Sequence, residues 1–305
     1  MITKKSYTVY QVDSFTVEKF KGNPAGVVSD ADNLTEAEMQ LIARELKNSE
    51  TAFIFTPEKK SNDYDVEVRF FTPTTEVPIC GHATVAAHFV RAVEQKAIPG
   101  EVVYQKTKAG ILPVKIEKSG NNFSIKMTQG KISFEKIAGD YQQQINRAIG
   151  LQQNDLRKDY PIEIASTGHS KVMIGITSKE TLNSLSPNLG DLKKLSPLIG
   201  CNGYFVFVID SDDDGILTHG RMFAPAVGID EDPVTGNANG PLGAYLVKNN
   251  LVQHNGIQFS FTAKQGEAMK REGAMKVTVD IENNYPQKVE IAGEAVIVFK
   301  TTIEV

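Results

Sequence analysis

Hydrophobic and polar residues alternate along many short segments of the chain, which is the period of a β-strand. Val66, Val68 and Phe70 are separated by charged Glu67 and Arg69, the pattern of a strand with one buried face. Short apolar or alternating runs predict further strands at residues 7–12, 52–55, 102–104, 112–116, 123–127, 162–165, 172–174, 204–209, 217–223, 257–261, 277–281, 289–291 and 295–300.

Other segments have the spacing of helices. Thr35 and Glu38 form a capping-box pattern, and the helix that it starts has Met39, Ile42 and Leu46 on one face. Further helices are predicted at residues 81–94, 142–149, 189–198 and 237–246. A turn is predicted at residues 22–26, before a short strand.

One sequence pattern occurs twice, half a chain apart. Arg69-Phe70-Phe71-Thr72-Pro73 precedes Gly81-His82-Ala83, and Arg221-Met222-Phe223-Ala224-Pro225 precedes Gly236-Asn237-Ala238. Both copies read Arg-x-Phe-x-Pro, then a polar loop, then a helix that begins with glycine. The repeat predicts an α+β protein of two similar domains, residues 1–135 and 136–305, each a curled sheet wrapped around one central helix. A strand near the C-terminus can cross into the sheet of the first domain.

Composition limits the class of protein. With 305 residues, the chain has the size at which one core gives way to two domains. A net charge of -4 gives no reason to expect nucleic acid or an anionic membrane surface as a partner. The apolar stretches are too short to span a bilayer, and the N-terminus lacks the apolar core of a signal peptide. We expect a soluble, cytoplasmic protein.

Neither a metal ion nor a nucleotide cofactor is expected. Cys80 and Cys201 have no CxxC spacing, and His82 and His88 are too far apart around a helix to share a face. The chain contains no HExxH, P-loop or GxGxxG motif.

The two glycine-led helix starts are the first candidates for a binding site. The first backbone N–H groups of a helix are unpaired and attract anions, so Gly81, Ala83, Thr235, Gly236 and Asn237 are predicted to bind a small carboxylate. A single helix start of this kind is usually only structural. Two copies at matched positions favour a site.

Glu50, His82 and Asp232 are the candidate catalytic residues, because each lies close in sequence to a strand or helix start. A carboxyl or imidazole group there can transfer protons. Taken singly, each has an ordinary structural alternative. Asp232 in particular is placed where it would cap the helix that begins at Gly236.

These motifs together resemble the phenazine-biosynthesis PhzF-like family. The resemblance covers nearly the whole chain and rests on four motifs in order: residues 12–28, Asn48-Ser49-Glu50-Thr51-Ala52-Phe53, Gly81-His82-Ala83-Thr84 and Glu231-Asp232-Pro233-Val234-Thr235-Gly236. It implies a diaminopimelate-epimerase-like fold with two barrel-like domains related by a pseudo-twofold axis and the active site in the cleft between them. It also implies a homodimer, no cofactor, and isomerisation by proton transfer. By motif position, Glu50 takes the acid/base role and His82 and Asp232 take supporting roles.

Two departures from the family patterns bear on the chemistry. Asn237 stands where well-known members have a serine, so the substrate is expected to differ. Diaminopimelate epimerase has a cysteine before each glycine-led helix, whereas here Cys80 fills the first position and Thr235 the second. A two-thiol mechanism is therefore not available.

Three functions remain open from the sequence. The first is a cofactor-independent isomerase in which Glu50 moves a proton on a small carboxylic acid. The second is a one-base epimerase that uses Cys80, which the helix start would make more acidic. The third is a non-catalytic protein that keeps the cleft to bind a small ligand or a partner.

Overall fold

The computed structural model describes residues 5–57, 63–95, 97–210 and 215–305. The chain divides into two compact units, which are described separately: unit 1 consists of Met1–Thr128 and Ala292–Val305, and unit 2 of Gln129–Ile291. The sequence placed the boundary between residues 135 and 136, a few residues later. The last strand, β17 (Tyr285–Glu304), has residues in both units.

The described residues of unit 1 form a mixed sheet and two helices. Its strands are β1 (Ser6–Ser14), β2 (Asn23–Val28), β3 (Thr51–Phe55), β4 (Val66–Phe71), β5 (Glu76–Val77), β6 (Val102–Thr107), β7 (Gly110–Ser119), β8 (Asn122–Thr128) and the second half of β17. Its helices are α1 (Glu36–Leu46) and α2 (Gly81–Gln95). β8 pairs with β7 and β17, and β17 pairs with β1, so the strands close into a ring.

Unit 2 contains a second mixed sheet. Its strands are β9 (Ser133–Lys136), β10 (Glu163–Ser166), β11 (Lys171–Gly175), β12 (Tyr204–Ile209), β13 (Thr218–Ala224), β14 (Ile229–Asp232), β15 (Gln258–Gln265), β16 (Gly273–Glu282) and the first half of β17. Its helices are α3 (Gly139–Ile149), α4 (Lys179–Ser184), α5 (Leu189–Ile199) and α6 (Gly236–Lys248), with a 3₁₀ turn, η1, at Pro225–Val227.

Strand pairing shows that the two units repeat one topology. In unit 1, β1–β2 is antiparallel, β2–β3 parallel, β3–β4 antiparallel, β4–β6 parallel and β6–β7 antiparallel. Unit 2 repeats this order and these directions in strands β10, β11, β12, β13, β15 and β16. The short strands β5 and β14 each form an antiparallel pair with the strand of the repeated arginine motif. The predicted duplication and the α+β class are confirmed.

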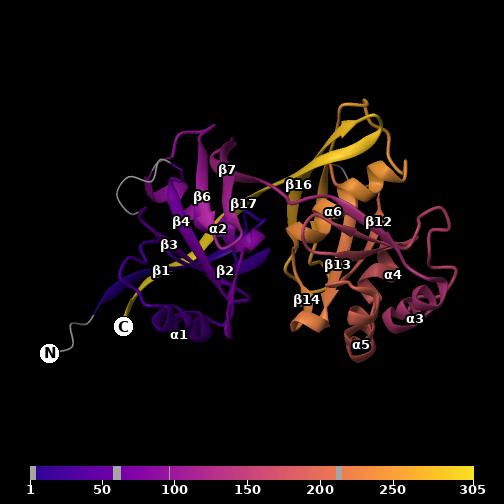
Figure 1. Ribbon diagram of the computed structural model, residues 1–305, viewed down its shortest axis with the longest axis horizontal. Helices are drawn as coiled ribbons and strands as arrows, with labels where there is room; N and C mark the ends of the chain where they lie inside the picture. Colours follow the sequence, from indigo (N-terminus) through magenta and orange to yellow (C-terminus); the bar gives the residue numbers. More distant parts are fainter. Residues whose placement is uncertain (1–4, 58–62, 96, 211–214) are drawn as a thin grey trace. The chain divides into compact units, whose positions relative to one another are not determined.

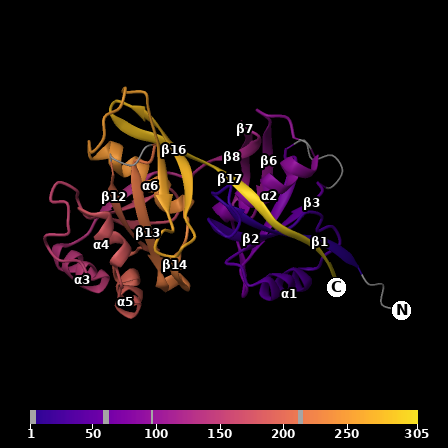
Figure 2. The same ribbon diagram turned by 180° about the vertical axis from the view of Figure 1, so that it is seen from behind.

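In each unit one helix lies among the strands and others cover the outside. Helix α2 contacts β1, β2, β3, β7 and β8, and α6 contacts β10, β11, β15 and β16 (Figure 1 and, from behind, Figure 2). Both helices are buried along most of their length, so they form the interior of each unit. Outside, α1 packs on β1, β2 and β3, while α3, α4 and α5 pack on the outer face of β10–β13. Each unit is therefore layered around one enclosed helix.

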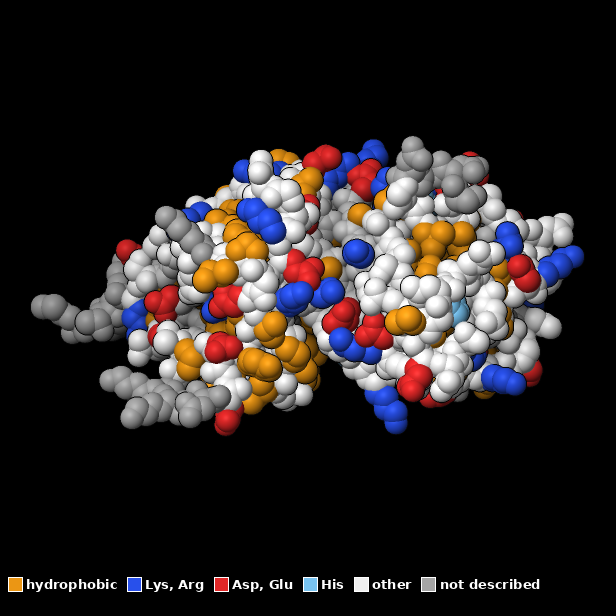
Figure 3. Space-filling model, turned by 90° about the horizontal axis from the view of Figure 1, so that it is seen from above, with side chains coloured by type: hydrophobic (Ala, Val, Ile, Leu, Met, Phe, Trp, Pro, Cys, Tyr) orange, Lys and Arg blue, Asp and Glu red, His pale blue; other side chains and the backbone are white. Residues whose placement is uncertain are grey.

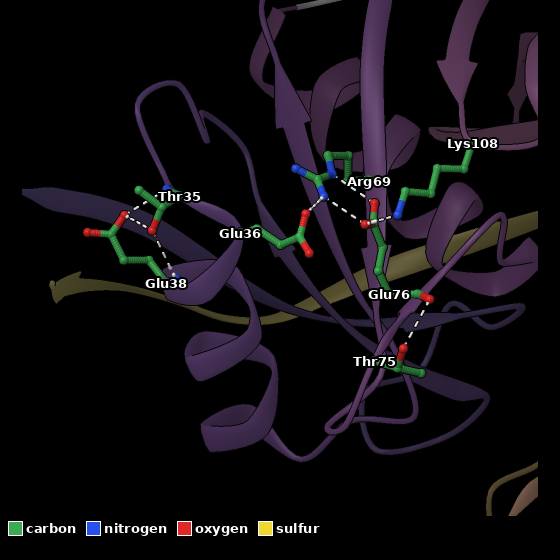
Figure 4. Close-up of polar contacts among 7 residues, drawn as sticks. All are labelled: Thr35, Glu36, Glu38, Arg69, Thr75, Glu76 and Lys108. Carbon is green, nitrogen blue, oxygen red and sulfur yellow. Dashed lines mark hydrogen bonds and ion pairs between the residues drawn. The ribbon is translucent and has the colours of Figure 1, made fainter.

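Local sequence explains where α1 begins. The Thr35 side chain accepts a hydrogen bond from the Glu38 amide, and the Glu38 carboxylate accepts one from the Thr35 amide at 2.7 Å (Figure 4). The predicted capping box is confirmed, and Met39 and Ile42 are buried beneath the sheet as expected. The predicted turn at residues 22–26 is only partly correct: Gly22 has φ +59°, but β2 already starts at Asn23, because Asn23 to Gly26 pair with β1.

Both copies of the repeated arginine form the same cluster. Arg69 donates to both oxygens of Glu76 at 2.7–2.8 Å and contacts Glu36 (Figure 4). Its guanidinium lies over the Phe71 ring. Hydrogen bonds from Arg69 and Lys108 lower the pKa of Glu76, although burial works in the opposite direction. The motif arginines therefore tie β4 to β5 and, as described next, β13 to β14.

In unit 2 the arginine of the cluster is more deeply buried, with 8% of its side chain exposed against 22% for Arg69. Arg221 donates to both oxygens of Glu231 at 2.8 Å and to the carbonyls of Leu182 and Leu185 at 3.0 and 2.9 Å. Its guanidinium lies over the Phe223 ring. The group therefore fixes the segment that leads into Asp232 and α6.

The surface mixes both signs of charge. Figure 3 shows acidic and basic side chains interspersed with apolar ones on the face in view, in keeping with a net charge of -4. Within the described ranges, no helix combines the length and the apolar character needed to cross a membrane.

We predict that Arg221→Lys lowers the Tm by roughly 5 °C or more, because one ammonium group cannot satisfy two carbonyls and a bidentate carboxylate together. Arg157→Lys is the matched control, since Arg157 forms a similar pair with Asp159 in which the side chains are 45% and 60% exposed. Its Tm should stay within about 2 °C of wild type. Differential scanning calorimetry of both variants makes the measurement, and equal losses would contradict the prediction.

Candidate functional site

The loop that contains Glu50 is fixed from both sides. Helix α1 ends at Lys47, which has φ 56°, and the chain then turns towards β3. The side-chain amides of Asn48 and Gln11 bond each other in both directions at 2.9 Å. The Glu50 carbonyl accepts from the Gly26 amide at 3.3 Å, where a Cβ on Gly26 would meet Leu46 and Thr51 at 2.8 Å. Glycine is therefore required for the approach of this loop to β2.

The His82 ring contacts three polar side chains of unit 1. Its Nε2 lies 3.4 Å from Glu50 Oε2 and 3.2 Å from Ser49 Oγ, while its Nδ1 lies 3.4 Å from Cys80 Sγ. The side chains of Glu50 and His82 are 14% and 9% exposed. The Ser14 hydroxyl donates to the His82 carbonyl at 2.8 Å. The structure thus brings together a carboxylate and a thiol with one imidazole between them.

This arrangement has a definite chemistry. With Nε2–H donating to Glu50, Nδ1 can accept the thiol proton of Cys80, so both possible bases are linked through one ring. One donor atom from each of Glu50, Cys80 and His82 lies within 4.8 Å of the others, which is close enough to hold a metal ion. The spacing of the histidines did not reveal this set of donors, because Glu50 lies in one segment of the sequence and Cys80 and His82 lie in another. The absence of a metal stays a prediction.

The start of α2 offers unpaired donors beside this cluster. The Thr84 amide and hydroxyl both bond the Cys80 carbonyl, at 2.9 and 2.7 Å. The amides of Gly81, His82 and Ala83 have no acceptor among the described residues. A Cβ on Gly81 would meet no atom within 4 Å, so packing inside the protein does not require glycine there. The helix start faces open space, as an anion site must.

In unit 2, Asp232 and Thr235 form the corresponding turn. Asp232 ends β14, and its carboxylate accepts a short hydrogen bond from the Thr235 hydroxyl. Thr235 is the N-cap of α6, but its side chain forms no bond to the helix. Asp232 therefore holds the N-cap residue of α6 in place through this hydrogen bond.

Gln265, which the sequence did not single out, fastens this turn. Its Oε1 accepts from the Thr235 amide at 3.2 Å and from the Asn239 amide group at 2.9 Å. Its Nε2 donates to the Asp232 carbonyl at 2.7 Å and to the Thr235 hydroxyl at 3.1 Å. Gln265 is 1% exposed, so no solvent replaces these bonds.

Helix α6 begins tightly packed. A Cβ on Gly236 would lie 2.4 Å from Ile291, and one on Gly240 would lie 1.8 Å from the Gln129 side chain. The Gln129 amide group donates to the Gly236 carbonyl at 2.8 Å. Asn237 leaves the helical conformation, with φ -84° and ψ 23°. Within the described part of the chain, the amides of Gly236 and Asn237 have no acceptor, so α6 also presents unpaired donors.

Comparison with known proteins identifies what this chain resembles. The family model described as phenazine biosynthesis-like protein matches residues 12–301. An uncharacterized isomerase of Clostridium acetobutylicum is 57% identical over 300 residues, with 98% of each chain covered. The trans-2,3-dihydro-3-hydroxyanthranilate isomerase of Pseudomonas fluorescens is 28% identical over 296 residues, which covers 96% of this chain and 97% of that protein.

Comparison with solved structures shows the same similarity. A PhzF-family phenazine biosynthesis protein of Bacillus anthracis has a TM-score of 0.88 and 31% identity, and the alignment covers 99% of this chain and 100% of that one. A hydroxyproline epimerase of Agrobacterium vitis has a TM-score of 0.61 at 12% identity, covering 100% of this chain and 93% of that one, so it shows likeness of fold alone.

We predict that Gln265→Met destabilises the protein by at least about 2 kcal/mol, because it removes four hydrogen bonds from a buried turn, those with the Thr235 amide and hydroxyl, the Asn239 amide group and the Asp232 carbonyl. Gln258→Met is the control, since Gln258 is exposed and makes one bond to Asp280 at 2.9 Å. It should cost less than about 0.5 kcal/mol. Urea denaturation followed by circular dichroism compares the two, and a Gln265 variant as stable as the control would refute the assigned role.

Proposed function

The chain belongs to the phenazine biosynthesis-like protein family and is an isomerase, and from this premise we propose that Glu50 moves a proton within a small carboxylic acid. The observation that carries the proposal is the contact of 3.4 Å between Glu50 Oε2 and His82 Nε2. A base that is 14% exposed, oriented by an imidazole and placed near unpaired helix amides has what general base catalysis needs.

The proposed reaction balances without a co-reactant. The Glu50 carboxylate takes a proton from a carbon atom of the substrate, and the electron pair left behind enters the conjugated system of the substrate. The protonated Glu50 then returns that proton to a different carbon. His82 donates its Nε2–H to Glu50 and so stabilises the carboxylate between turnovers. Substrate and product are isomers, and no cofactor takes part.

We assign binding of the substrate's polar groups to the helix starts. The amides at Gly81 and Ala83 and those at Gly236 and Asn237 are donors suited to a carboxylate. Asp232, held by Thr235, is an acceptor for a hydroxyl or an ammonium group. The isomerase of Pseudomonas fluorescens is named for trans-2,3-dihydro-3-hydroxyanthranilate, so we propose a cyclic or amino-acid-like acid as the substrate class.

Cys80 is a second candidate for the base. Its Sγ lies 3.4 Å from His82 Nδ1, so transfer of the thiol proton to the ring would leave a thiolate beside an imidazolium. An epimerase that uses this single thiol would need Cys80 and would tolerate loss of the Glu50 charge. Non-catalytic ligand binding is a third alternative. A cytoplasmic homodimer remains a prediction.

We predict that Glu50→Gln reduces turnover by about 10²–10⁴-fold, because glutamine keeps the size of the side chain but cannot accept a proton. Protein in D₂O is incubated with trans-2,3-dihydro-3-hydroxyanthranilate and with a panel of small carboxylates, and mass spectrometry detects deuterium uptake or an isobaric product. Wild-type protein should incorporate deuterium into one or more of these acids.

Two further variants separate the alternatives. Glu45→Gln removes an exposed carboxylate from the same unit and should leave turnover unchanged. If Glu50→Gln keeps wild-type turnover while Cys80→Ser loses it, the thiol mechanism replaces ours. If wild type binds carboxylates with thermal stabilisation but exchanges no deuterium, the non-catalytic alternative is favoured.

A further inference from the structure

Lys171 is a buried cation with few partners. It is the first residue of β11 and is 3% exposed. Its ammonium group has three donors, yet among the described residues it makes one hydrogen bond, to the adjacent Ser170 carbonyl at 3.3 Å, and no ion pair within 4 Å. Buried ammonium groups are costly unless they are paired. A structural lysine would normally find a carboxylate.

The repeated topology shows which residue of unit 2 corresponds to Glu50. In unit 1 the Gly26 amide bonds the Glu50 carbonyl, and in unit 2 the Val172 amide bonds the Gly203 carbonyl at 2.9 Å. Glu50 directly precedes β3, and Gly203 directly precedes β12. Gly203 is therefore the counterpart of Glu50 in the second copy of the fold, and it has no side chain.

The Lys171 side chain uses the space that Gly203 leaves. A Cβ on Gly203 would lie 3.2 Å from Lys171 Cδ, so the methylene stem runs across this glycine. The same Cβ would lie 3.1 Å from Ala224 on β13, the strand that pairs with β14 and so with Asp232. Where unit 1 has Glu50, unit 2 has a glycine crossed by the stem of a lysine side chain.

Two titratable groups act on this ammonium, and a third responds to its charge. Burial lowers the pKa of Lys171 to about 8, while the negative charge of Asp232 and the Cys201 thiol work in the opposite direction. The charge of Lys171 in turn contributes to a lowered pKa of His169, after burial. Near neutral pH the group is mostly charged, and its remaining donors call for an anionic acceptor.

We propose that Lys171 is a substrate-binding residue of unit 2, whose ammonium group pairs with the carboxylate of the isomerase's substrate next to Asp232. The inference rests on the proposed function for the class of ligand. The Lys171 ammonium adds a fixed positive charge to the unpaired amides of α6. The second copy of the fold then binds substrate through a cation, whereas the first copy acts on it through the Glu50 carboxylate.

The test follows the Lys171 signal directly by NMR of full-length protein labelled with ¹³Cε-lysine, with the signal identified by its loss in Lys171→Met. In the free protein this signal should titrate near pH 8. Benzoate and anthranilate should raise the midpoint by about one unit or more, because a bound carboxylate favours the charged form. Benzamide, which has no charge, should not move it.

Binding measurements provide the second arm. Lys171→Met should weaken benzoate or anthranilate binding by about 10–100-fold, the range of a charge-assisted hydrogen bond in a buried site. Lys193→Met, which removes an exposed lysine of α5, should bind like wild type. If Lys171→Met does not fold, Lys171→Arg identifies the signal instead and the wild-type titration decides.

Two results would overturn the proposal. One is no shift of the Lys171 midpoint with either carboxylate. The other is a midpoint that falls in Asp232→Asn but ignores carboxylates, which would make Lys171 only a counter-ion of Asp232. Neither measurement depends on turnover, and the deuterium experiment does not depend on Lys171, so the two proposals fail separately.

Discussion

The constraint on which this structure depends is that a helix enclosed by a sheet begins with backbone amides that no helical carbonyl can satisfy. Helices α2 and α6 both lie among strands, and both begin with glycine. The protein supports the turn before each helix, through Cys80 and Thr84 in one unit and through Thr235 and Gln265 in the other, yet leaves the first amides unpaired. Each unit therefore keeps an anion-attracting position at the start of its interior helix.

The two copies of the fold have diverged around this common feature. Unit 1 places Glu50 beside its helix start, with His82 as the link to Cys80. Unit 2 has Gly203 at the matching position, and Lys171 fills the space. The residue at this position can thus differ between the units, a carboxylate in one and a glycine crossed by a neighbouring lysine in the other, because the backbone bonds that define the position, from Gly26 to Glu50 and from Val172 to Gly203, do not involve the side chains.

Features whose residues lie within one short segment could be predicted from the sequence, whereas contacts between distant segments could not. The capping box at Thr35 and Glu38 was predictable because its partners are three residues apart. The repeated arginine motif predicted the duplication, though not that Arg221 would bond the Leu182 and Leu185 carbonyls. Gln265 escaped notice because the turn that it fastens lies some 30 residues away in sequence. Proximity of Glu50 to His82 was suggested by the family motifs, and only folding brings them to 3.4 Å.

The path of β17 has a consequence for biosynthesis. Its last residues pair with β1 along almost the whole of that strand, from Ser6 with Glu304 to Ser14 with Ala295. A ribosome makes β1 long before its partner β17, so unit 1 stays an open sheet until β17 has left the exit tunnel. Unit 2, made of one continuous segment, can fold earlier. The nascent chain thus completes its second unit before its first, and β1 waits as an unpaired edge that chaperones have reason to cover.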